Sequence, residues 1–240
     1  MGRVKIARKD TFIDMTAMSD VTVLLLTFFM LTSTFLAKEP ATVVTPPSVS
    51  TEKVQETNYV QVLVNPEGKV WLTMNNDTSA NWSNDKMRMA LLDKVSEIYN
   101  ETHKNKISFT PEQKYTFSKQ SSFGVPLAKM GEFLDLAGQN EGQTKMDKWL
   151  EGDGDPAHPT GIPISWNQNE AMPNEFQIWM KALRQTDNTN LADKIKDGTG
   201  VAIKADQNTS FDVVHMVMDN LQTIHMNKFT LLTALKGPEE

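Results

Sequence analysis

Cysteine is absent from the 240 residues, which excludes disulfide bonds and thiolate metal sites. A basic cluster is also missing beyond the first ten residues, and the net charge is −6 with a pI near 5.3. Nucleic-acid binding depends on phosphate contacts and therefore needs such a cluster. These absences exclude a disulfide scaffold and argue against nucleic acid as a partner.

Signatures of enzymes and metal sites are lacking as well. No GxSxG, P-loop or GxGxxG motif stands between a predicted strand and a helix. Asp153 and Asp155 have the first two spacings of a calcium loop, but Ala157 and Pro159 follow where an EF-hand needs ligands. The histidines also show no metal-ligand spacing; they are His103, His158, His215 and His225. We therefore expect no enzymatic activity, no cofactor and no metal.

A single long apolar run lies near the N-terminus. Met15–Ala37 contains one formal charge, Asp20, and includes the stretch VTVLLLTFF at Val21–Phe29. A helix needs roughly 20 mainly apolar residues to cross a bilayer, so the run predicts a transmembrane helix over residues 12–37. A cleaved signal peptide is the alternative, but its apolar region is about 7–15 residues long and ends in a small-x-small site, with only Ala37 as a candidate here.

The charges beside this run predict its orientation. Four basic residues precede it, namely Arg3, Lys5, Arg8 and Lys9. Basic flanks stay on the cytoplasmic side of a membrane. We therefore expect residues 1–11 to be cytoplasmic and everything after the span to be exported, and no second run of comparable length follows.

Asp20 is the candidate functional residue of the span. A charged side chain inside a span costs about 2.5–3.5 kcal/mol, and such residues often relay protons or ions. On a helical wheel Thr16, Thr27 and Thr34 fall within about 40° of it, which gives a polar stripe. The alternative is that Asp20 lies near the interface and the threonines bond to helix carbonyls. Asp14 points about 120° away, so we interpret it as an interfacial or helix-start residue with a secondary role at a proton exit as the lesser alternative.

The segment after the span is predicted to be an extended linker over residues 38–58. Its prolines, Pro40, Pro46 and Pro47, prevent a regular helix. The piece Thr42–Thr45 has strand character, and two interpretations stay open: addition to a sheet edge, or a plain spacer.

Residues 59–240 predict a small α+β domain with helices packed on one face of its strands. The elements expected at its two ends are a hairpin over 59–64 and 69–74, a helix over 85–99, a strand over 201–205, a helix over 210–224 and a strand over 229–233. Residues of about 100–199 form an insertion with helices expected over 126–137, 144–150 and 174–184 and a long loop over 151–169. We expect Trp149, Trp166 and Trp179 to anchor this insertion in the core and His215 to lie on a helix surface.

Two stretches at opposite ends of the chain resemble the ExbD/TolR family. In that family an Asp opens an apolar run that ends in a Phe-Met pair, as Asp20 and Phe29-Met30 do here, although Ala17 stands where a Pro is common. Near the C-terminus Ala205-Asp206 precedes Phe211, as in the family's closing strand–helix–strand unit. The stretches with this resemblance are residues 13–36, about 59–99 and 200–233.

The resemblance implies a proton-driven motor subunit in a bacterial inner membrane, single-pass, with a cytoplasmic N-terminus and a periplasmic domain. Its implied partners are a pentameric ring of a multi-span ExbB/TolQ-like protein around two copies of this chain, and a periplasm-spanning TonB-like protein. Asp20 would carry protons, with Thr16, Thr27 and Thr34 lining the route. Two alternatives remain: the same motor with another output, such as Tol-Pal-like envelope constriction, gliding or defence, and a passive single-span anchor for a periplasmic binding domain.

Overall fold

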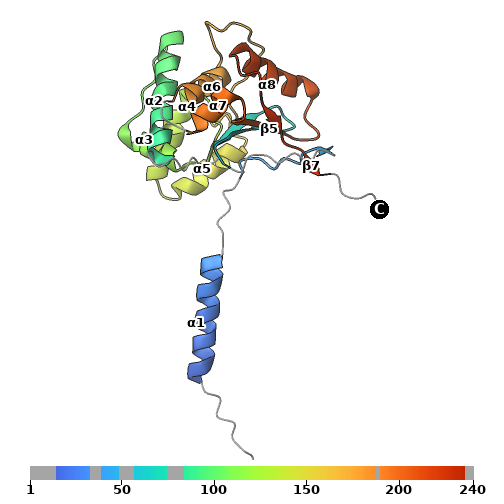
Figure 1. Cartoon of the computed structure of the whole chain (residues 1–240). Helices are drawn as coiled ribbons and strands as arrows, with labels where there is room; N and C mark the ends of the chain where they lie inside the picture. Colours follow the sequence, from blue (N-terminus) through green and yellow to red (C-terminus); the bar gives the residue numbers. More distant parts are fainter. Residues whose placement is uncertain (1–14, 33–38, 49–56, 75–83, 187–189, 236–240) are drawn as a thin grey trace, which may run out of the picture. The chain divides into compact units, whose positions relative to one another are not determined.

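A computed structural model of the chain describes residues 15–32, 39–48, 57–74, 84–186 and 190–235. The chain divides into two compact units, Met1–Lys38 and Glu39–Glu240. In the first unit the structure describes one helix, α1 (Met15–Thr32), and in the second it describes all the remaining elements (Figure 1). Each unit is treated by itself below.

The second unit combines helices with a mixed sheet, so the predicted α+β class is confirmed. Its described helices are α2 (Asn84–Thr102), α3 (Pro111–Lys119), α4 (Leu127–Asp135), the short 3-10 helix η1 (Leu136–Gly138), α5 (Gly142–Glu151), α6 (Glu175–Gln185), α7 (Asn190–Asp197) and α8 (Phe211–Thr223). Its described strands are β1 (Pro47–Ser48), β2 (Val60–Val64), β3 (Val70–Met74), β4 (Ser122–Phe123), β5 (Val201–Ala205), β6 (Thr230–Leu231) and β7 (Ala234–Leu235).

Five of these strands form the main sheet, in the order β4-β3-β2-β5-β6. The pair β2 and β3 is antiparallel, as the predicted hairpin requires, whereas β2 pairs with β5 and β5 with β6 in parallel. Helix α8 connects β5 to β6, so the closing strand–helix–strand unit is present. The short strands β1 and β7 form a separate parallel pair.

The hairpin turn follows from its sequence, Asn65-Pro66-Glu67-Gly68. The Asn65 side-chain oxygen accepts from the backbone N–H of Lys69 at 2.9 Å, and its backbone carbonyl accepts from Gly68 at 3.0 Å. Gly68 has φ +78°, a left-handed conformation that favours glycine. Local hydrogen bonds therefore set the register of β2 against β3.

Both faces of the central strands are covered, which corrects the expectation that helices pack on one face only. All five residues of β2 are buried, although successive side chains point to opposite faces of a sheet. Figure 1 shows α2, α6 and α8 on one side of the sheet and α5 on the other. On the α5 side the Trp71 indole N–H donates to the Leu150 carbonyl at 3.1 Å, and Gly124 leaves room for the indole because a Cβ there would lie 2.0 Å from it. The insertion supplies this second layer, which residue periodicity alone did not reveal.

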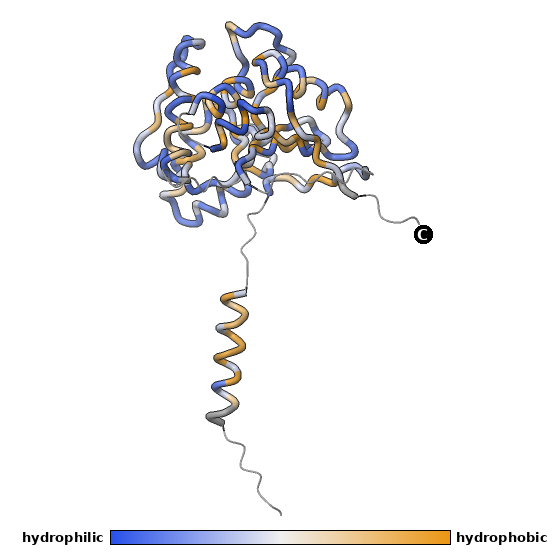
Figure 2. Tube along the Cα trace, viewed as in Figure 1, coloured by the Kyte–Doolittle hydropathy of each residue, from blue (hydrophilic) through white to orange (hydrophobic). Residues whose placement is uncertain are grey.

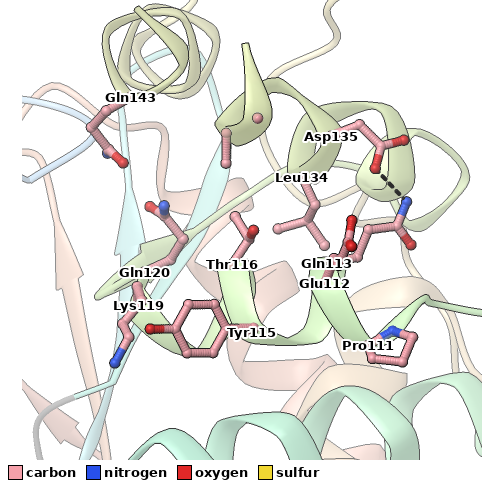
Figure 3. A pocket seen from close by; sticks show the side chains of 12 residues that line it. Pro111, Glu112, Gln113, Tyr115, Thr116, Lys119, Gln120, Leu134, Asp135 and Gln143 are labelled. Carbon is pink, nitrogen blue, oxygen red and sulfur yellow. Dashed lines mark hydrogen bonds between the residues drawn. The ribbon is translucent and has the colours of Figure 1, made fainter.

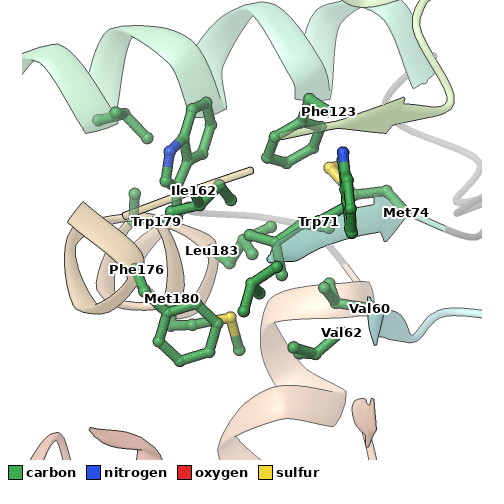
Figure 4. Packing of buried hydrophobic residues seen from close by; sticks show 14 of the residues in the cluster. Val60, Val62, Trp71, Met74, Phe123, Ile162, Phe176, Trp179, Met180 and Leu183 are labelled. Carbon is green, nitrogen blue, oxygen red and sulfur yellow. The ribbon is translucent and has the colours of Figure 1, made fainter. Parts of the chain in front are cut away.

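The core on the other face is built largely by the insertion. Trp179 of α6 is fully buried and packs against Phe123 of β4, with ring centroids 4.5 Å apart and the ring planes tilted by 40° (Figure 4). Phe117 of α3 completes this aromatic group at 5.8 Å from Trp179. Trp149 is also buried, so two of the three tryptophan predictions are confirmed. The third is wrong because Trp166 is 51% exposed and its ring lies against His215 on the surface of α8.

Several elements of the insertion differ from the prediction. Helices α4, α5 and α6 match the expected ranges to within about two residues, whereas α3, α7 and β4 were not expected. The start of α3 does carry a local signal: Thr110 and Gln113 form a reciprocal capping box, and Pro111 occupies the first turn. Strand β4 has only two residues and pairs with β3, which lies far from it in the sequence. No local sequence pattern therefore predicts it.

Candidate functional site

Helix α1 carries a single charged residue, Asp20, in an otherwise apolar or hydroxyl-bearing sequence. Its large apolar side chains from Met18 to Leu31 are each more than half exposed. Figure 2 shows hydrophobic residues along most of the helix. Soluble proteins rarely expose a continuous apolar surface of this extent, and such surfaces mark contact with a protein or a membrane. Asp20 is therefore the one formal charge in the apolar surface of this helix.

Thr27 is the stripe residue whose side chain the structure places together with Asp20. Seven residues are nearly two full turns, so the two side chains lie about 20° apart around the helix. The Thr27 hydroxyl donates to the Leu24 carbonyl at 2.9 Å. Thr22 and Thr32, which lie off the stripe, make the same kind of bond to Met18 and Phe28. Back-bonding uses the hydroxyl hydrogen and leaves the oxygen lone pairs able to accept from water or from a protonated carboxyl.

For the other predicted site residues the structure describes no side chain. Thr16 lies in α1, but its side chain is outside the described part of the chain, and Asp14 and Thr34 lie outside the described residues altogether. Among the helices that the structure describes, none is both long and apolar enough to cross a membrane.

A second group of polar contacts connects the start of the second unit to its sheet. The Val44 backbone N–H donates to the Asp206 carboxylate at 2.8 Å, and the Val44 carbonyl accepts from the Gln207 N–H at 2.8 Å. Glu39 forms an ion pair with Lys204 of β5 at 2.6 Å. Residues 39–48, part of the predicted linker, are thus extended and lie against the folded unit. Sequence reasoning noted Asp206 as a family position but missed this contact, because 162 residues separate the two partners.

Asp206 is held in its charged form by these contacts. Its carboxylate accepts backbone N–H groups from Asn208 and Val44 and the side-chain amide of Asn208. The hydrogen bonds from Asn208 and Val44 lower the pKa of Asp206 below its usual range. Asp206 therefore joins the β5–α8 loop to the extended segment for as long as it stays ionised.

The acidic loop after α5 satisfies its own charges. The Asp153 carboxylate bonds to the ring of His158 at 2.6 Å and to the backbone N–H of Asp155 at 2.9 Å. The hydrogen bond from His158 is the main cause that lowers the pKa of Asp153. Within the described residues no group of His, Asp or Glu side chains is arranged to hold a metal ion.

Comparison with known proteins gives one informative match. A family model described as Biopolymer transport protein ExbD/TolR matches residues 7–143, more than half of the chain. The chain belongs to the ExbD/TolR family. Searches of curated proteins and of solved structures gave no match.

Membership in the ExbD/TolR family assigns a broad role. Its members are biopolymer-transport proteins that act in energy transduction and not as enzymes. They are generally associated with ExbB/TolQ and TonB-like partners and with the inner membrane. The match includes residues 100–143, which the motifs place outside the resemblance, and ends before the β5–α8–β6 unit, which the motifs place inside it. Because β4 joins the main sheet, this first part of the insertion is integral to the domain.

Proposed function

We propose that this ExbD/TolR-family chain is a single-pass subunit of a proton-driven motor and that Asp20 carries the protons. Residues 1–11 are cytoplasmic in this proposal, residues 12–37 span the inner membrane, and the rest is periplasmic. The observation that carries the proposal is the apolar exposed surface of α1 with one carboxylate in it. A passive anchor has no use for a charge that costs about 2.5–3.5 kcal/mol in a span.

The proposed span uses residues on both sides of α1. An 18-residue helix is about 27 Å long, slightly shorter than the roughly 30 Å hydrocarbon core of a bilayer. The sequence continues from Ser33 to Ala37 without a formal charge, which supplies the remaining length. The basic residues before Asp10 then stay on the cytoplasmic side.

Proton transfer through Asp20 requires a partner that admits water. Backbone and side chains facing lipid meet no water, so a lone helix offers no proton path. In this proposal an ExbB/TolQ-like multi-span protein forms a pentameric ring around two copies of α1 and encloses Asp20. The acceptor lone pairs of Thr16, Thr27 and Thr34 line the route. One charge moving through 100 mV releases about 2.3 kcal/mol, so repeated steps are needed for mechanical work.

In this proposal the periplasmic unit transmits the mechanical work that proton transfer drives. It pairs with a second copy and acts on a TonB-like protein that reaches the outer membrane. Residues 39–48, which follow the proposed span in the sequence, lie against the sheet through Val44, Asp206 and the Glu39–Lys204 ion pair, and this is their attachment to the domain. Other outputs of the same motor, such as Tol-Pal-like envelope constriction, gliding or defence, would use the same attachment.

Proton flux into vesicles tests the proposal directly. The chain is reconstituted with its ring partner, and wild type is compared with Asp20→Asn, which keeps the size and hydrogen bonding but cannot release a proton. We expect flux under an imposed potential for wild type and none for Asp20→Asn, with equal assembly of both complexes. Equal flux from the two assembled complexes, or silence from both, would replace the motor by a passive single-span anchor.

A further inference from the structure

Three aromatic rings gather on the exposed side of α8. The His215 ring lies nearly parallel to the Phe211 ring one turn earlier, with centroids 5.8 Å apart and planes 9° apart. Trp166, from the insertion, meets the same His215 ring at 5.3 Å with the planes at 64°. Phe211 is 71% exposed, Trp166 is 51% exposed, and His215 is exposed as well. We call these three residues the aromatic surface, and the proposed motor does not use it.

The exposed Trp166 ring is carried by a fixed piece of backbone. Asn220 of α8 is fully buried and donates its side-chain amide to the Ser165 carbonyl at 3.0 Å. Gln177 of α6 is also fully buried and donates to the Asn167 carbonyl at 3.1 Å. Both neighbours of Trp166 are therefore anchored by buried amides, whereas its own indole N–H makes no hydrogen bond to a described residue. A large aromatic side chain on a fixed backbone loses little freedom on binding and is typical of interface hot spots.

Two carboxylates without a cation lie on the same side of α8. Asp219 and Asp212 fall about 40° and 60° from His215 around the helix. Among the described residues neither carboxylate has a hydrogen-bond or ion-pair partner, and the Oδ2 atom of Asp219 is buried without one. By contrast Glu67, in the hairpin turn, is paired with Lys69 at 2.9 Å. The carboxylates beside the aromatic surface are therefore short of a donor.

Aromatic faces beside unpaired carboxylates suit a cation. A ring attracts a cation held over its face, and a carboxylate adds a charge-assisted hydrogen bond. The guanidinium of arginine meets both demands because it is planar, stacks on rings and donates two parallel hydrogen bonds to one carboxylate, whereas the lysine ammonium is a point charge. The chain has a net charge of −6 although residues 1–38 carry more bases than acids, so the negative balance lies in the second unit and attracts a cationic partner.

The folded unit of a second copy does not supply this arginine. After residue 38 the sequence has two arginines, Arg88 and Arg184. Arg88 is buried and donates to the carbonyls of Ser118 and Gln120. Arg184 is half-buried and donates to the Ile224 carbonyl at 2.6 Å. Both guanidinium groups are thus bonded inside their own unit, so a free one comes from another protein.

We propose that the aromatic surface is a docking site for an arginine side chain on a basic segment of a partner protein. The guanidinium stacks on Trp166 and donates to Asp219, and the aliphatic part of the side chain packs on Phe211. A neutral apolar partner would cover the two carboxylates without giving them a donor, which costs free energy. An anionic lipid surface would be repelled by them. The contact adds to the proposed motor and does not depend on proton transfer.

Calorimetric titration of the full chain in phosphatidylcholine nanodiscs tests this site, with empty nanodiscs as the blank. The probe is a capped heptapeptide in which arginine alternates with glycine, and its matched control carries citrulline, a planar neutral isostere, in place of each arginine. We expect saturable binding of the arginine peptide and about tenfold weaker binding of the citrulline peptide, because a charge-assisted hydrogen bond is lost. No binding of the arginine peptide, or equal binding of both peptides, would overturn the proposal.

Substitutions locate the binding on α8 and the loop beside it. Trp166→Ala and Asp219→Asn should each weaken binding of the arginine peptide about tenfold. The controls are Asp193→Asn on α7 and Tyr115→Ala, which removes a ring of similar exposure from the groove between α3, α4 with η1, and α5 (Figure 3). Asp212→Asn changes an exposed side chain and keeps the test valid if Asp219→Asn fails to fold. Wild-type affinity in the folded variants, or loss of binding in Tyr115→Ala alone, would place the peptide elsewhere and overturn the assignment.

Two further outcomes would give the aromatic surface a different neighbour and overturn the proposal. Tighter binding of a heptapeptide with leucine in place of arginine would make it a purely apolar docking surface. Fluorescence quenching by brominated lipid that is present in wild type and absent in Trp166→Phe would place Trp166 against the membrane. None of these measurements uses proton flux, so they stand or fall separately from the motor.

Discussion

Helices α1 and α2 have similar lengths but opposite relations to their surroundings. Helix α2 buries Leu91 and Val95 one turn apart and presents polar side chains elsewhere, whereas α1 exposes Leu25 and its other large apolar side chains. The stripe of α2 matches a core inside its own unit. Helix α1 has an apolar surface that no other described residue of its own unit covers.

The largest expected effect is a loss of free energy of unfolding when a buried side chain of the second unit is removed, compared with removal of an exposed side chain in either unit. Trp179→Ala should cost about 3–5 kcal/mol of the free energy of unfolding, because the cavity lies among Phe117 and Phe123. Leu25→Ala in α1 and Trp166→Ala at the surface should each change it by less than about 0.5 kcal/mol. Urea denaturation followed by near-UV circular dichroism measures all three. Similar losses for Trp179→Ala and Leu25→Ala would mean that α1 packs into the folded unit after all.

The next effect concerns the buried amides that join the insertion to α8. Asn220 is fully buried, accepts from the Asn174 side chain at 2.7 Å and donates to the Ser165 carbonyl at 3.0 Å. Asn220→Ala removes both of these bonds, while the Asn174 amide keeps its bond to the Ser165 carbonyl at 3.0 Å, and it should cost about 1–3 kcal/mol. The same denaturation assay measures it, with Gln222→Ala on the exposed side of α8 as the control. A neutral Asn220→Ala would show that the loop and α8 are held together by apolar packing alone.

A smaller effect concerns Asp206 and the pH dependence of the free energy of unfolding of the second unit. The pKa of Asp206 is lower in the folded state than the unfolded value of about 3.9, so its ionised form stabilises the fold above that pH. This stabilisation should be lost as the pH falls through the folded-state pKa. Asp206→Asn should therefore show a shallower loss of unfolding free energy than wild type on acidification from about pH 6 to pH 3. Asp193→Asn, an exposed control, should follow wild type, and parallel wild-type and Asp206→Asn curves would contradict the prediction.

The smallest expected effect lies within α1 itself. Thr27→Val removes a hydroxyl about 20° from Asp20, and Thr22→Val removes a back-bonded hydroxyl about 160° away. Thr27→Val should lower proton flux about threefold, in line with about 0.6 kcal/mol for a polar contact in a membrane. Thr22→Val should leave the flux unchanged. Equal effects of the two variants would remove the stripe from the proposed route while leaving Asp20 in place.

Much of the domain could be predicted because its patterns are local. The hairpin β2–β3 follows from alternating residues around a turn whose bonds involve Asn65, Gly68 and Lys69. Helices α2 and α8 follow from apolar spacing, and the candidate residues Asp20 and Thr27 follow from helical periodicity in α1. A repeat of 2.0 or 3.6 residues is a property of neighbouring positions, so it can be recognised without knowing the tertiary fold.

Other features depend on partners far apart in the chain. Strand β4 forms because Phe123 pairs with Leu72 of β3 and its ring meets Trp179, which is 56 positions further along the chain. Trp166 stays exposed because the bonds of Asn174 and Asn220 to Ser165 hold the chain next to it at the surface of α8. None of these contacts has a signal in the surrounding sequence.

The sequence by itself determined an apolar N-terminal helix with one carboxylate, the hairpin and the closing strand–helix–strand unit, because each needs only local periodicity and turn chemistry. Only the tertiary structure decided that the sheet is covered on both faces, that Val44 binds Asp206, and that Trp166 meets His215 and Phe211 on one surface. Burial and hydrogen bonding between distant residues depend on how the elements pack. That packing depends on contacts among elements from the whole chain, so no local stretch of sequence determines it.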